Sequence, residues 1–367
     1  MSTLHRYTLP VEETHWNVEG GNAVSFTWDY DATSDDLLRL YAKGKQQQWD
    51  ADTRIDWSLS VDPDDPMQID DALLPVYGTP LWNKLGDRQK SDLRYHNQVF
   101  QLSQFLHGEQ GALICSAKIV QDVPRIESKF YAATQVMDEA RHVEVYRRLL
   151  NEKFRFCYPI TAPLKSLLEK AIADRRWDFT YLAMQVLIEG LALAAFQRIR
   201  DYAKNRLCAT INAYVMQDEA RHVAFGRYAL RDYYPQLTAA ERREREEFVI
   251  EASYMMRDRM NSPEMWAHIG IDPNDAEAAA KGSDSMIRYR MRLFSRIVPT
   301  VKDIGLWSNE VQKAYTDLGA IQYADSDADK LLADDANIAE EFDRLMAKGE
   351  GALPRKPAPI SRSGSQQ

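Results

Sequence analysis

The hexapeptide Asp-Glu-Ala-Arg-His-Val occurs twice in the sequence, at residues 138–143 and again at residues 218–223. In each copy a glutamate precedes a histidine by three positions: Glu139 before His142, and Glu219 before His222. Two residues at this spacing on an α-helix share one face and lie about 5–6 Å apart. Each copy can therefore offer one carboxylate and one imidazole to the same metal ion, a ligand mixture that suits iron or manganese.

Two further glutamates extend the repeat. Each Glu-x-x-His pair has another glutamate 30 residues before its own, Glu109 in the first half and Glu189 in the second. A di-metal site in a four-helix bundle needs one such glutamate from each of two additional helices. Pro124 lies midway through the first interval and favours a turn there, which would place both carboxylates roughly 20 Å from the turn, at 1.5 Å rise per residue. The best turn candidate in the second interval is Asn205.

The charge of these groups also indicates a metal site. Four carboxylates and two neutral imidazoles carry four negative charges, which two divalent cations balance. Without metal, four buried carboxylates would repel one another and could not all stay ionised. A single Glu-x-x-His pair is more typical of a solvated helix surface, but two identical copies with matching upstream glutamates favour a di-metal site.

The composition is that of a globular protein that can bury a large core: 367 residues, 45% hydrophobic and 28% charged. The net charge of −9 argues against a nucleic-acid surface, because phosphate binding needs clustered Lys and Arg. No apolar run is long enough to predict a membrane span, and the N-terminus lacks a signal-peptide pattern. The sequence has three widely spaced cysteines, Cys115, Cys157 and Cys208. They are more typical of a protein in the reducing cytoplasm than of a disulfide framework, so we expect a soluble cytoplasmic protein.

Helical periodicity and helix breakers divide the chain into four parts. Apolar residues recur every three or four positions from about 88 to 235, which indicates helices. Ser34 is typical of an N-cap that opens a short helix, and further helices are expected at 239–262, 282–296 and 336–347. The predicted parts are an N-terminal extension with irregular segments and a short helix at 1–87, a four-helix bundle at 88–235, C-terminal helices packed on the bundle at 236–349, and a disordered tail at 350–367.

The doubled motif with its upstream glutamates resembles the ferritin-like di-iron oxidase superfamily over roughly residues 88–235. That superfamily includes ribonucleotide reductase small subunits, multicomponent monooxygenase hydroxylases, ligand-binding oxidases and arylamine N-oxygenases. The resemblance implies an all-α fold, a ferritin-like four-helix bundle with additional N- and C-terminal helices. It also implies six metal ligands, namely Glu109, Glu139, His142, Glu189, Glu219 and His222.

The resemblance further implies a role for the residues around the ligands. In the superfamily the aspartate before each Glu-x-x-His accepts the free ring N–H of a ligand histidine, and Asp138 and Asp218 match it. Arg141 and Arg221 would pair with these aspartates and compensate their buried charge. The alternative interpretation is that these are surface ion pairs between residues three apart on exposed helix faces.

Several positions depart from the individual branches of the superfamily. Tyr146 follows the first ligand histidine by four residues, where ribonucleotide reductase small subunits keep a radical tyrosine, but a packing or hydrogen-bonding role is the alternative. Multicomponent monooxygenases carry Thr where this chain has Leu193, and ligand-binding oxidases carry Tyr where it has Met184. Arylamine N-oxygenases carry an additional ligand His where it has Val215. The chain therefore resembles a stand-alone member of the superfamily.

Small residues cluster beside two of the expected ligands: Gly108, Gly111 and Ala112 near Glu109, and Gly190, Ala192 and Ala195 near Glu189. Glycine within a helix costs roughly 0.5–1 kcal/mol relative to alanine, so these positions need a reason. Close helix packing is one reason, and a substrate cavity is the other. The candidate cavity residues by spacing are Phe105, Ala112, Leu113, Leu193 and Phe196.

The resemblance favours an O2-dependent non-haem di-iron oxygenase or oxidase that hydroxylates or N-oxygenates a small apolar or aromatic substrate. Its expected cofactors are two iron ions, with manganese as an alternative at one position, and O2 is the expected co-substrate. No flavin or nicotinamide motif is visible, so electrons would come from an external donor such as a ferredoxin or reductase. A homodimer is a family-level expectation. The alternatives are a tyrosyl-radical-generating subunit and an iron-handling ferritin-like protein.

Overall fold

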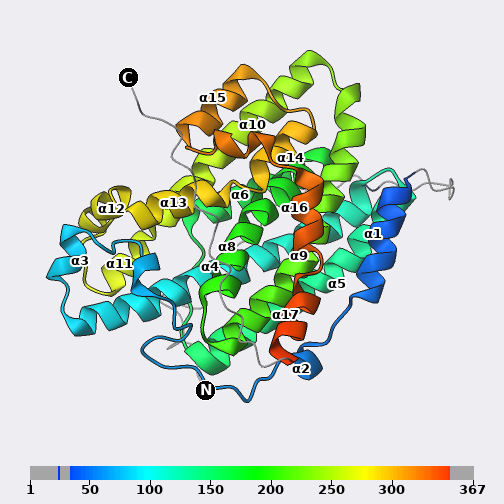
Figure 1. Ribbon diagram of the computed structural model, residues 1–367. Helices are drawn as coiled ribbons and strands as arrows, with labels where there is room; N and C mark the ends of the chain where they lie inside the picture. The colour runs from blue at the N-terminus through cyan, green and yellow to red at the C-terminus, as the bar shows by residue number, and fades with distance from the viewer. Residues whose placement is uncertain (1–23, 25–33, 348–367) are drawn as a thin grey trace.

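The computed structural model describes residue 24 and residues 34–347 (Figure 1). Within these residues the chain forms α-helices, short 3-10 helices and two π-helical segments, and no β-strand. The predicted all-α class is therefore confirmed. The predicted disorder of residues 350–367 lies outside the described residues, as do residues 1–23 and 25–33 of the predicted N-terminal extension.

Four long helical stretches form the centre of the molecule. They are α4 (Asp87–Asp122), α5 (Ile126–Arg148), α8 (Glu189–Tyr202) and α9 (Arg206–Tyr233). Helices α4 and α5 pack along each other as one hairpin, and α8 and α9 pack as the second. A short helix α7 (Trp177–Tyr181) and the π-helix η5 (Leu182–Ile188) lead directly into α8. The whole stretch from 177 to 202 is therefore one continuous bundle element.

The two hairpins have the same geometry. Helix α4 ends 13 residues after Glu109, and α5 begins 13 residues before Glu139. The second hairpin repeats both distances for Glu189 and Glu219. Each glutamate thus lies roughly 20 Å along its helix from a three-residue link, at 1.5 Å rise per residue. This symmetry places all four carboxylates at one level of the bundle.

Both links contain the residues that the sequence indicated. Pro124 lies in the first link, one residue before the N-cap Arg125 rather than in the first helical turn. Val123 before it is extended, as the residue preceding proline prefers. Asn205 caps α9 in the second link, where its side-chain oxygen accepts a hydrogen bond from the Cys208 N–H at 3.2 Å.

The hairpins are joined by a crossover that contains a helix of its own. The chain leaves α5 through the π-helix η4 (Leu149–Phe154) and then forms α6 (Ala162–Ala173) before it enters α7. Thr161 is the N-cap of α6 and Pro163 lies in its first turn, where a missing N–H costs nothing. This helix was not predicted as a separate element within the helical stretch at 88–235.

The N-terminal part begins with α1 (Asp35–Gln46), whose N-cap is Ser34 as predicted. It packs along α5 and α9 (Figure 1). Three short helical elements follow α1 before the first bundle helix. These are α2 (Ala51–Arg54), the 3-10 helix η3 (Asp71–Leu73) and α3 (Pro80–Lys84).

The C-terminal part surrounds the second hairpin. Helices were predicted at 239–262, 282–296 and 336–347, and the structure has α10 (Ala239–Asp258), α13 (Asp284–Leu293) and α17 (Ile338–Ala347) there. Helices α16 and α17 lie along α9 (Figure 1). The remaining elements were not predicted: η6 (Tyr234–Gln236), η7 (Arg259–Asn261), α11 (Pro263–His268), α12 (Pro273–Lys281), α14 (Ile297–Asp303), α15 (Asn309–Asp317), η8 (Ile321–Asp325) and α16 (Ala328–Asp335).

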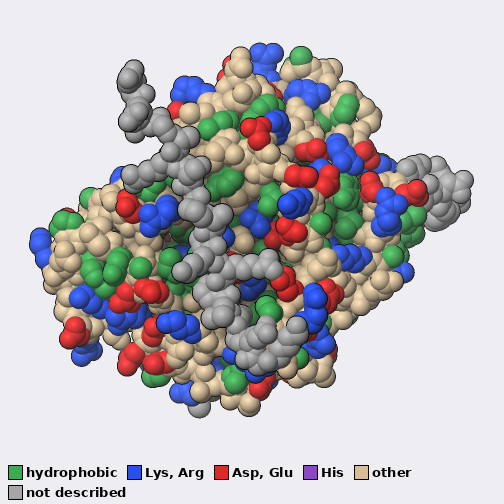
Figure 2. Space-filling model, in the orientation of Figure 1, with side chains coloured by type: hydrophobic (Ala, Val, Ile, Leu, Met, Phe, Trp, Pro, Cys, Tyr) green, Lys and Arg blue, Asp and Glu red, His purple; other side chains and the backbone are tan. Residues whose placement is uncertain are grey.

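One helical stretch, Trp177–Tyr202, is long and apolar enough to cross a membrane by length and composition alone. Its most apolar window is 94% buried inside the protein, because it forms part of the bundle core. A core helix of a globular protein passes the same test. On the face of the molecule seen in Figure 2, the described acidic and basic side chains are interspersed.

Two of the small residues near the expected ligands are explained by close packing. A Cβ atom built on Gly111 would lie 2.4 Å from Leu168 Cδ2 of α6, and one on Gly190 would lie 3.0 Å from Ile297 Cγ1 of α14. A Cβ on Gly108 would have no neighbour within 4 Å. Close packing therefore explains why positions 111 and 190 hold glycine. The space beside Gly108 is open, so packing does not explain the glycine there.

Candidate metal centre

Six acidic and histidine side chains from four helices converge in the middle of the bundle. They form two groups whose potential ligand atoms lie within 4.8 Å of one another. One group contains Glu109 of α4, Glu139 and His142 of α5, and Glu219 of α9; the other contains Glu139, Glu189 of α8 and His222 of α9. All six side chains are buried, and Glu139 belongs to both groups. The shared carboxylate is what two adjacent metal ions would need as a bridge.

The Nδ1 atoms of the two histidines lie among carboxylate oxygens. His142 Nδ1 lies 3.2 Å from Glu109 Oε2, 3.3 Å from Glu139 Oε2 and 3.1 Å from Glu219 Oε1. His222 Nδ1 lies 3.1 Å from Glu139 Oε1 and 3.5 Å from Glu219 Oε1. One ring nitrogen carries at most one proton, so it cannot satisfy two or three carboxylates at once. A cation at the centre of each group can.

Several buried carboxylate oxygens have no hydrogen-bond partner among the described residues. They are Oε2 of Glu139, Oε2 of Glu189 and both oxygens of Glu219. A buried acceptor without a partner costs roughly 1–3 kcal/mol, and more when it is charged. Carboxylate oxygens and imidazole nitrogens are suitable ligands for iron and manganese. The donor set therefore fits two such ions.

Burial and mutual repulsion change how the carboxylates titrate. Burial raises the pKa of Glu109 and of Glu189 well above the usual value, and the nearby Glu219 raises both further. Burial also opposes ionisation of Glu139, but His222 and His142 outweigh it and hold its pKa well below the usual range. In the absence of metal, protons thus compensate part of the negative charge. Metal binding at this cluster would displace them.

A glutamine that the sequence analysis missed holds two of the carboxylates. Gln135 lies one turn before Glu139 on α5 and is buried. Its side-chain amide donates to Glu139 Oε1 at 3.0 Å and to Glu189 Oε1 at 2.9 Å. Its spacing of four residues from Glu139 puts it on the ligand face and could have indicated it. Gln135 joins the two hairpins at the level of the cluster.

The backbone before Glu189 is a π-helix. The Glu189 N–H donates to the carbonyl of Met184, five residues earlier, at the end of η5. Single π-helical turns within α-helices are frequent at functional sites. Gly226 lets helix α9 approach this π-helix closely, because a Cβ atom at position 226 would lie 2.5 Å from the Cβ of Gln185. The helix carrying Glu189 is thus fitted closely against α9.

The two Asp-x-x-Arg pairs of the repeat form a buried network behind the histidines. His142 Nε2 lies 3.1 Å from Asp218 Oδ2, and His222 Nε2 lies 3.2 Å from Asp138 Oδ2. Arg141 donates to both aspartates, at 2.6 Å to Asp138 and 2.9 Å to Asp218. Arg221 also donates to both of them. All four side chains are buried, so they are not exposed surface pairs, and the two arginines balance the charge of the two aspartates.

Three residues that follow the last turn of α1 are hydrogen-bonded to this network, and their role was not predicted from the sequence. The side-chain oxygens of Gln48 and Gln47 accept hydrogen bonds from Arg141 and Arg221, both at 2.7 Å. Trp49 Nε1 donates to Asp218 Oδ2 at 2.8 Å. These residues come from outside the repeat. No sequence spacing relative to the repeat could have indicated them.

Tyr146 is buried beside the cluster but does not bond to it. Its hydroxyl donates to Asn212 Oδ1 of α9 at 3.1 Å. Its ring packs near Phe105 and Phe196, with centroid distances of 5.7 and 6.0 Å. Burial raises the pKa of Tyr146 well above its usual value, and the carboxylates of Glu109 and Glu219 raise it further. The contacts are those of a packed, hydrogen-bonded core tyrosine.

A small cavity of about 20 Å³ reaches the carboxylates of Glu109, Glu189 and Glu219. A water molecule needs roughly 10–15 Å³ by this measure, so the cavity has room for one or two. Three of the five candidate residues line it, whereas Leu113 and Leu193 do not. The lining includes Phe105, Gly108, Ala112, Met184, Ile188, Ala192 and Phe196.

The position of the cavity explains which candidates it includes. At 3.6 residues per turn, each residue advances about 100° around a helix. Ala112 and Ala192 follow their ligand glutamates by three residues and lie about 60° to one side, while Leu113 and Leu193 follow by four and lie about 40° to the other. All four residues lie on the helix face of their glutamate, but the cavity occupies only one side of that face.

An all-α bundle with a buried cluster of four carboxylates and two imidazoles is typical of ferritin-like di-iron and di-manganese carboxylate proteins. The chain belongs to the family described as P-aminobenzoate N-oxygenase AurF, whose model matches residues 29–305. No curated protein matches the chain. The family is one of ferritin-like di-iron oxygenases, so the predicted superfamily and the assignment as an oxidoreductase are confirmed.

Family membership corrects one inference from the sequence. Val215, in place of the additional histidine of arylamine N-oxygenases, was interpreted as separating this chain from that branch, yet the chain belongs to an N-oxygenase family. Val215 is buried on α9, one turn before Glu219, and offers no ligand atom. Among the described residues the cluster therefore has six donor side chains.

Proposed function

We propose that this protein binds two iron ions in the glutamate–histidine cluster and uses O2 to oxygenate a small aromatic substrate, with N-oxygenation of an arylamine as the reaction. The observation that carries the proposal is the pair of ligand groups that share Glu139. The family description, a p-aminobenzoate N-oxygenase, supports an aromatic amine. Glu109, Glu139, His142, Glu189, Glu219 and His222 are the proposed ligands.

The protein side chains would hold and orient this centre. Asp218 and Asp138 fix the Nε2–H tautomers of the two histidines and so direct Nδ1 toward the ions. Gln135 orients Glu139 and Glu189, while both oxygens of Glu219 remain free to change their mode of binding. When bound, iron supplies the redox chemistry with O2. Phe105, Phe196 and Met184 would exclude bulk water from the cavity.

The reaction needs electrons from outside the chain. Conversion of an arylamine to its hydroxylamine inserts one oxygen atom of O2 and reduces the other to water, which consumes two electrons and two protons. An external donor such as a ferredoxin or reductase is therefore part of the proposal. A homodimer and a cytoplasmic location are also proposed, and manganese in place of one iron is the alternative metal content.

Metal stoichiometry tests the site. Anaerobic titration with Fe(II) against a competing chelator should give two ions per chain in the wild type. Glu139→Ala should lose both, because the carboxylate belongs to both groups, whereas Glu189→Ala should keep one. Glu144→Ala is the matched control, since Glu144 is exposed on the same helix, and it should keep two. Two ions in Glu139→Ala would rule out this assignment.

Product analysis tests the reaction. The iron-loaded protein with a reductase and labelled O2 should convert arylamines to products that contain one labelled oxygen atom. Fully loaded protein that incorporates no label into any arylamine would contradict the proposal. The competing radical function is tested in the same samples: Tyr146→Phe should keep the activity. A long-lived tyrosyl signal in the wild type that disappears in this variant would instead assign radical generation.

A further inference from the structure

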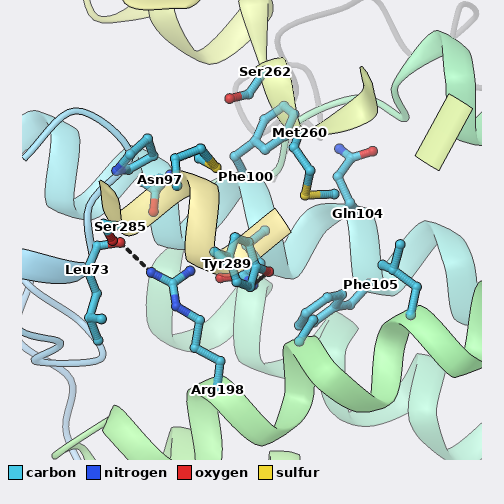
Figure 3. A pocket seen from close by; sticks show the side chains of 15 residues that line it. Leu73, Asn97, Phe100, Gln104, Phe105, Arg198, Met260, Ser262, Ser285 and Tyr289 are labelled. Carbon is cyan, nitrogen blue, oxygen red and sulfur yellow. Dashed lines mark hydrogen bonds between the residues drawn. The ribbon is translucent and has the colours of Figure 1, made fainter. Parts of the chain in front are cut away.

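A second cavity lies next to the small cavity, toward the end of α4 where the helix begins. Its volume is about 60 Å³, three times that of the small cavity, and it opens between α4, α8 and α13 (Figure 3). We call it the outer chamber. Its walls combine aromatic and apolar side chains with polar ones, and the polar side chains stand on several sides of it. Among its lining residues are Asn97, Phe100, Gln101, Arg198, Met286 and Tyr289.

The outer chamber and the small cavity are adjacent and share two lining residues, Gln104 and Phe105. Gln104 is held in place, because its amide donates to the Pro159 carbonyl at 2.9 Å and its oxygen accepts from the Thr161 N–H at 2.9 Å. Phe105 has only ring contacts, the nearest to Phe196 with a centroid distance of 4.6 Å. The Phe105 ring lies in the walls of both spaces and separates them.

Arg198 is the one charged side chain among the residues that line the outer chamber. It extends from α8 beside Tyr289, with its guanidinium 4.2 Å from the ring centroid, and donates to the Leu73 carbonyl (Figure 3). Within the described part of the chain no carboxylate lies within ion-pair distance of it. A guanidinium has five N–H donors arranged to bind a carboxylate, and most of those of Arg198 remain available.

The distance along the helices limits what can bind both places. Arg198 follows Glu189 by nine residues, roughly 13 Å along α8, and Gln101 precedes Glu109 by eight residues, roughly 12 Å along α4. The side chains of Arg198 and of the glutamates cover part of this axial distance, and a molecule with an anionic end at Arg198 must cover the rest to reach the carboxylates. p-Aminobenzoate, the molecule in the family description, is a single ring with its two polar groups on opposite carbons, so it is shorter than this axial distance.

We propose that the outer chamber is the binding site for the carboxylate end of an elongated amphipathic acid. Its carboxylate binds Arg198, and its aromatic or apolar body passes Phe105 toward the small cavity. That the far end is oxygenated rests on the proposed function. Binding of the acid needs no metal, so the two proposals can fail separately.

The test is calorimetric binding to the metal-free full-length protein with ω-phenylalkanoates of increasing length, from phenylacetate to 6-phenylhexanoate, and with p-aminobenzoate. Affinity should rise with length by up to about fourfold per methylene group. p-Aminobenzoate should bind more weakly than the longest acid. The neutral alcohol 6-phenylhexanol should bind more weakly than the acid of the same length.

Three variants separate the contributions. Arg198→Met should lower the affinity for 6-phenylhexanoate about tenfold to a hundredfold and leave the alcohol unchanged, with Arg198→Lys between. Phe105→Trp should remove the advantage of the long acids over phenylacetate, because a larger ring would stand between the two spaces. Arg288→Met is the matched control, because Arg288 is exposed on α13 and does not line the chamber, and it should bind as the wild type does.

The outcomes are distinct. If no acid binds, if affinity does not depend on length, or if Arg198→Met binds the acids and the alcohol as the wild type does, the outer chamber is not this site. If Arg198→Met loses its thermal transition, the Arg198→Lys result decides. Length-dependent, Arg198-dependent binding in a protein that fails to bind two irons would support this inference and contradict only the proposed function.

Discussion

His142 is hydrogen-bonded to Asp218, the aspartate of the other repeat, and not to Asp138 of its own. The Nε2–Oδ2 distance is 3.1 Å, and the reciprocal pair, His222 with Asp138, is separated by 3.2 Å. Each helix therefore orients the proposed ligand histidine of the other. Helices α5 and α9 are joined through the network as well as through the metal site, so a change in one aspartate affects both hairpins.

Asp218→Asn tests this exchange. The variant keeps the shape of the side chain but loses its charge, so His142 is no longer held as firmly and Arg141 and Arg221 lose a shared partner. Metal affinity should fall about 10–100-fold, and the metal-free protein should lose about 3–5 kcal/mol of unfolding free energy because buried charges remain uncompensated. Chelator competition and urea unfolding measure the two effects.

The control for Asp218→Asn is Asp232→Asn, which changes an exposed aspartate near the end of the same helix. Asp232 pairs with Arg125 at 3.3 Å near the surface, so its loss should change stability by about 1 kcal/mol at most. If the two variants have equal metal affinity, the aspartate does not orient the ligand histidine.

Trp49→Phe tests whether the end of α1 supports the metal centre. Phenylalanine keeps an aromatic ring against Arg141 and Tyr214 but removes the N–H donated to Asp218 at 2.8 Å. Loss of a hydrogen bond to a charged acceptor should cost about 1.5–3 kcal/mol in unfolding free energy. Metal affinity should also fall, though less than in Asp218→Asn.

Trp57→Phe provides the comparison for Trp49→Phe. Trp57 Nε1 donates to the neutral Ala51 carbonyl at 2.9 Å, so its loss should cost about 0.5–1.5 kcal/mol and leave metal affinity unchanged. Equal effects of the two substitutions on metal affinity would mean that α1 stabilises the fold without supporting the site.

The bundle could be predicted from the sequence because its determinants are local and repeated. The spacing of Glu139 and His142 defines one helix face. Pro124 and Asn205 are residues that favour turns, and the two links between the bundle helices contain them. The short C-terminal helices α11, α12 and α14 to α16 have only six to nine residues. Isolated helices of that length are marginal, and tertiary packing rather than a periodic pattern forms them.

The supporting residues of the site could not be predicted in the same way. Gln47, Gln48 and Trp49 meet the repeat across about 90 to 170 residues of sequence. Nothing in their local pattern differs from an ordinary helix end. Leu193 shows a second limit: its spacing placed it on the face of Glu189, but the side of that face on which space remains depends on what packs there.

Gly111→Ala and Gly108→Ala are a matched pair on one helix. The new methyl group at position 111 would meet Leu168, 2.4 Å away in a buried contact, and should destabilise the protein by about 1–3 kcal/mol. At position 108 the methyl group meets nothing within 4 Å, and removing a helical glycine should stabilise the protein by about 0.5–1 kcal/mol. Urea unfolding of the metal-free proteins measures both.

The same pair separates stability from the cavity. Gly108 lines the small cavity whereas Gly111 does not, so Gly108→Ala should reduce turnover of bulky arylamines more than that of small ones. If Gly111→Ala is as stable as the wild type, the helix contact with Leu168 is not as close as the structure shows. If Gly108→Ala leaves the substrate range unchanged, substrates do not enter beside this residue.

His96 makes stability depend on pH. Burial, and then the neighbouring His268, lower the pKa of His96 to about 4. Its Nδ1 lies 2.8 Å from the Tyr158 hydroxyl, and its ring lies 4.7 Å from that of His268. The unfolded chain takes up a proton near pH 6.5, but the folded protein does so only near pH 4. Stability is therefore lost as the pH falls from about 6.5 to about 4.

His96→Asn should remove this dependence, because asparagine does not titrate. His96 is only half-buried, so after allowance for solvent screening we expect about 1 kcal/mol of stability to be lost by the wild type, relative to the variant, between pH 7.5 and pH 5. Urea midpoints of both proteins at the two pH values give the difference. The carboxylate cluster lies 13 residues along α4, roughly 20 Å away, so its titration affects both proteins equally and cancels. Parallel losses in the two proteins would show that the His96 ring takes up its proton in the folded protein as readily as in the unfolded chain.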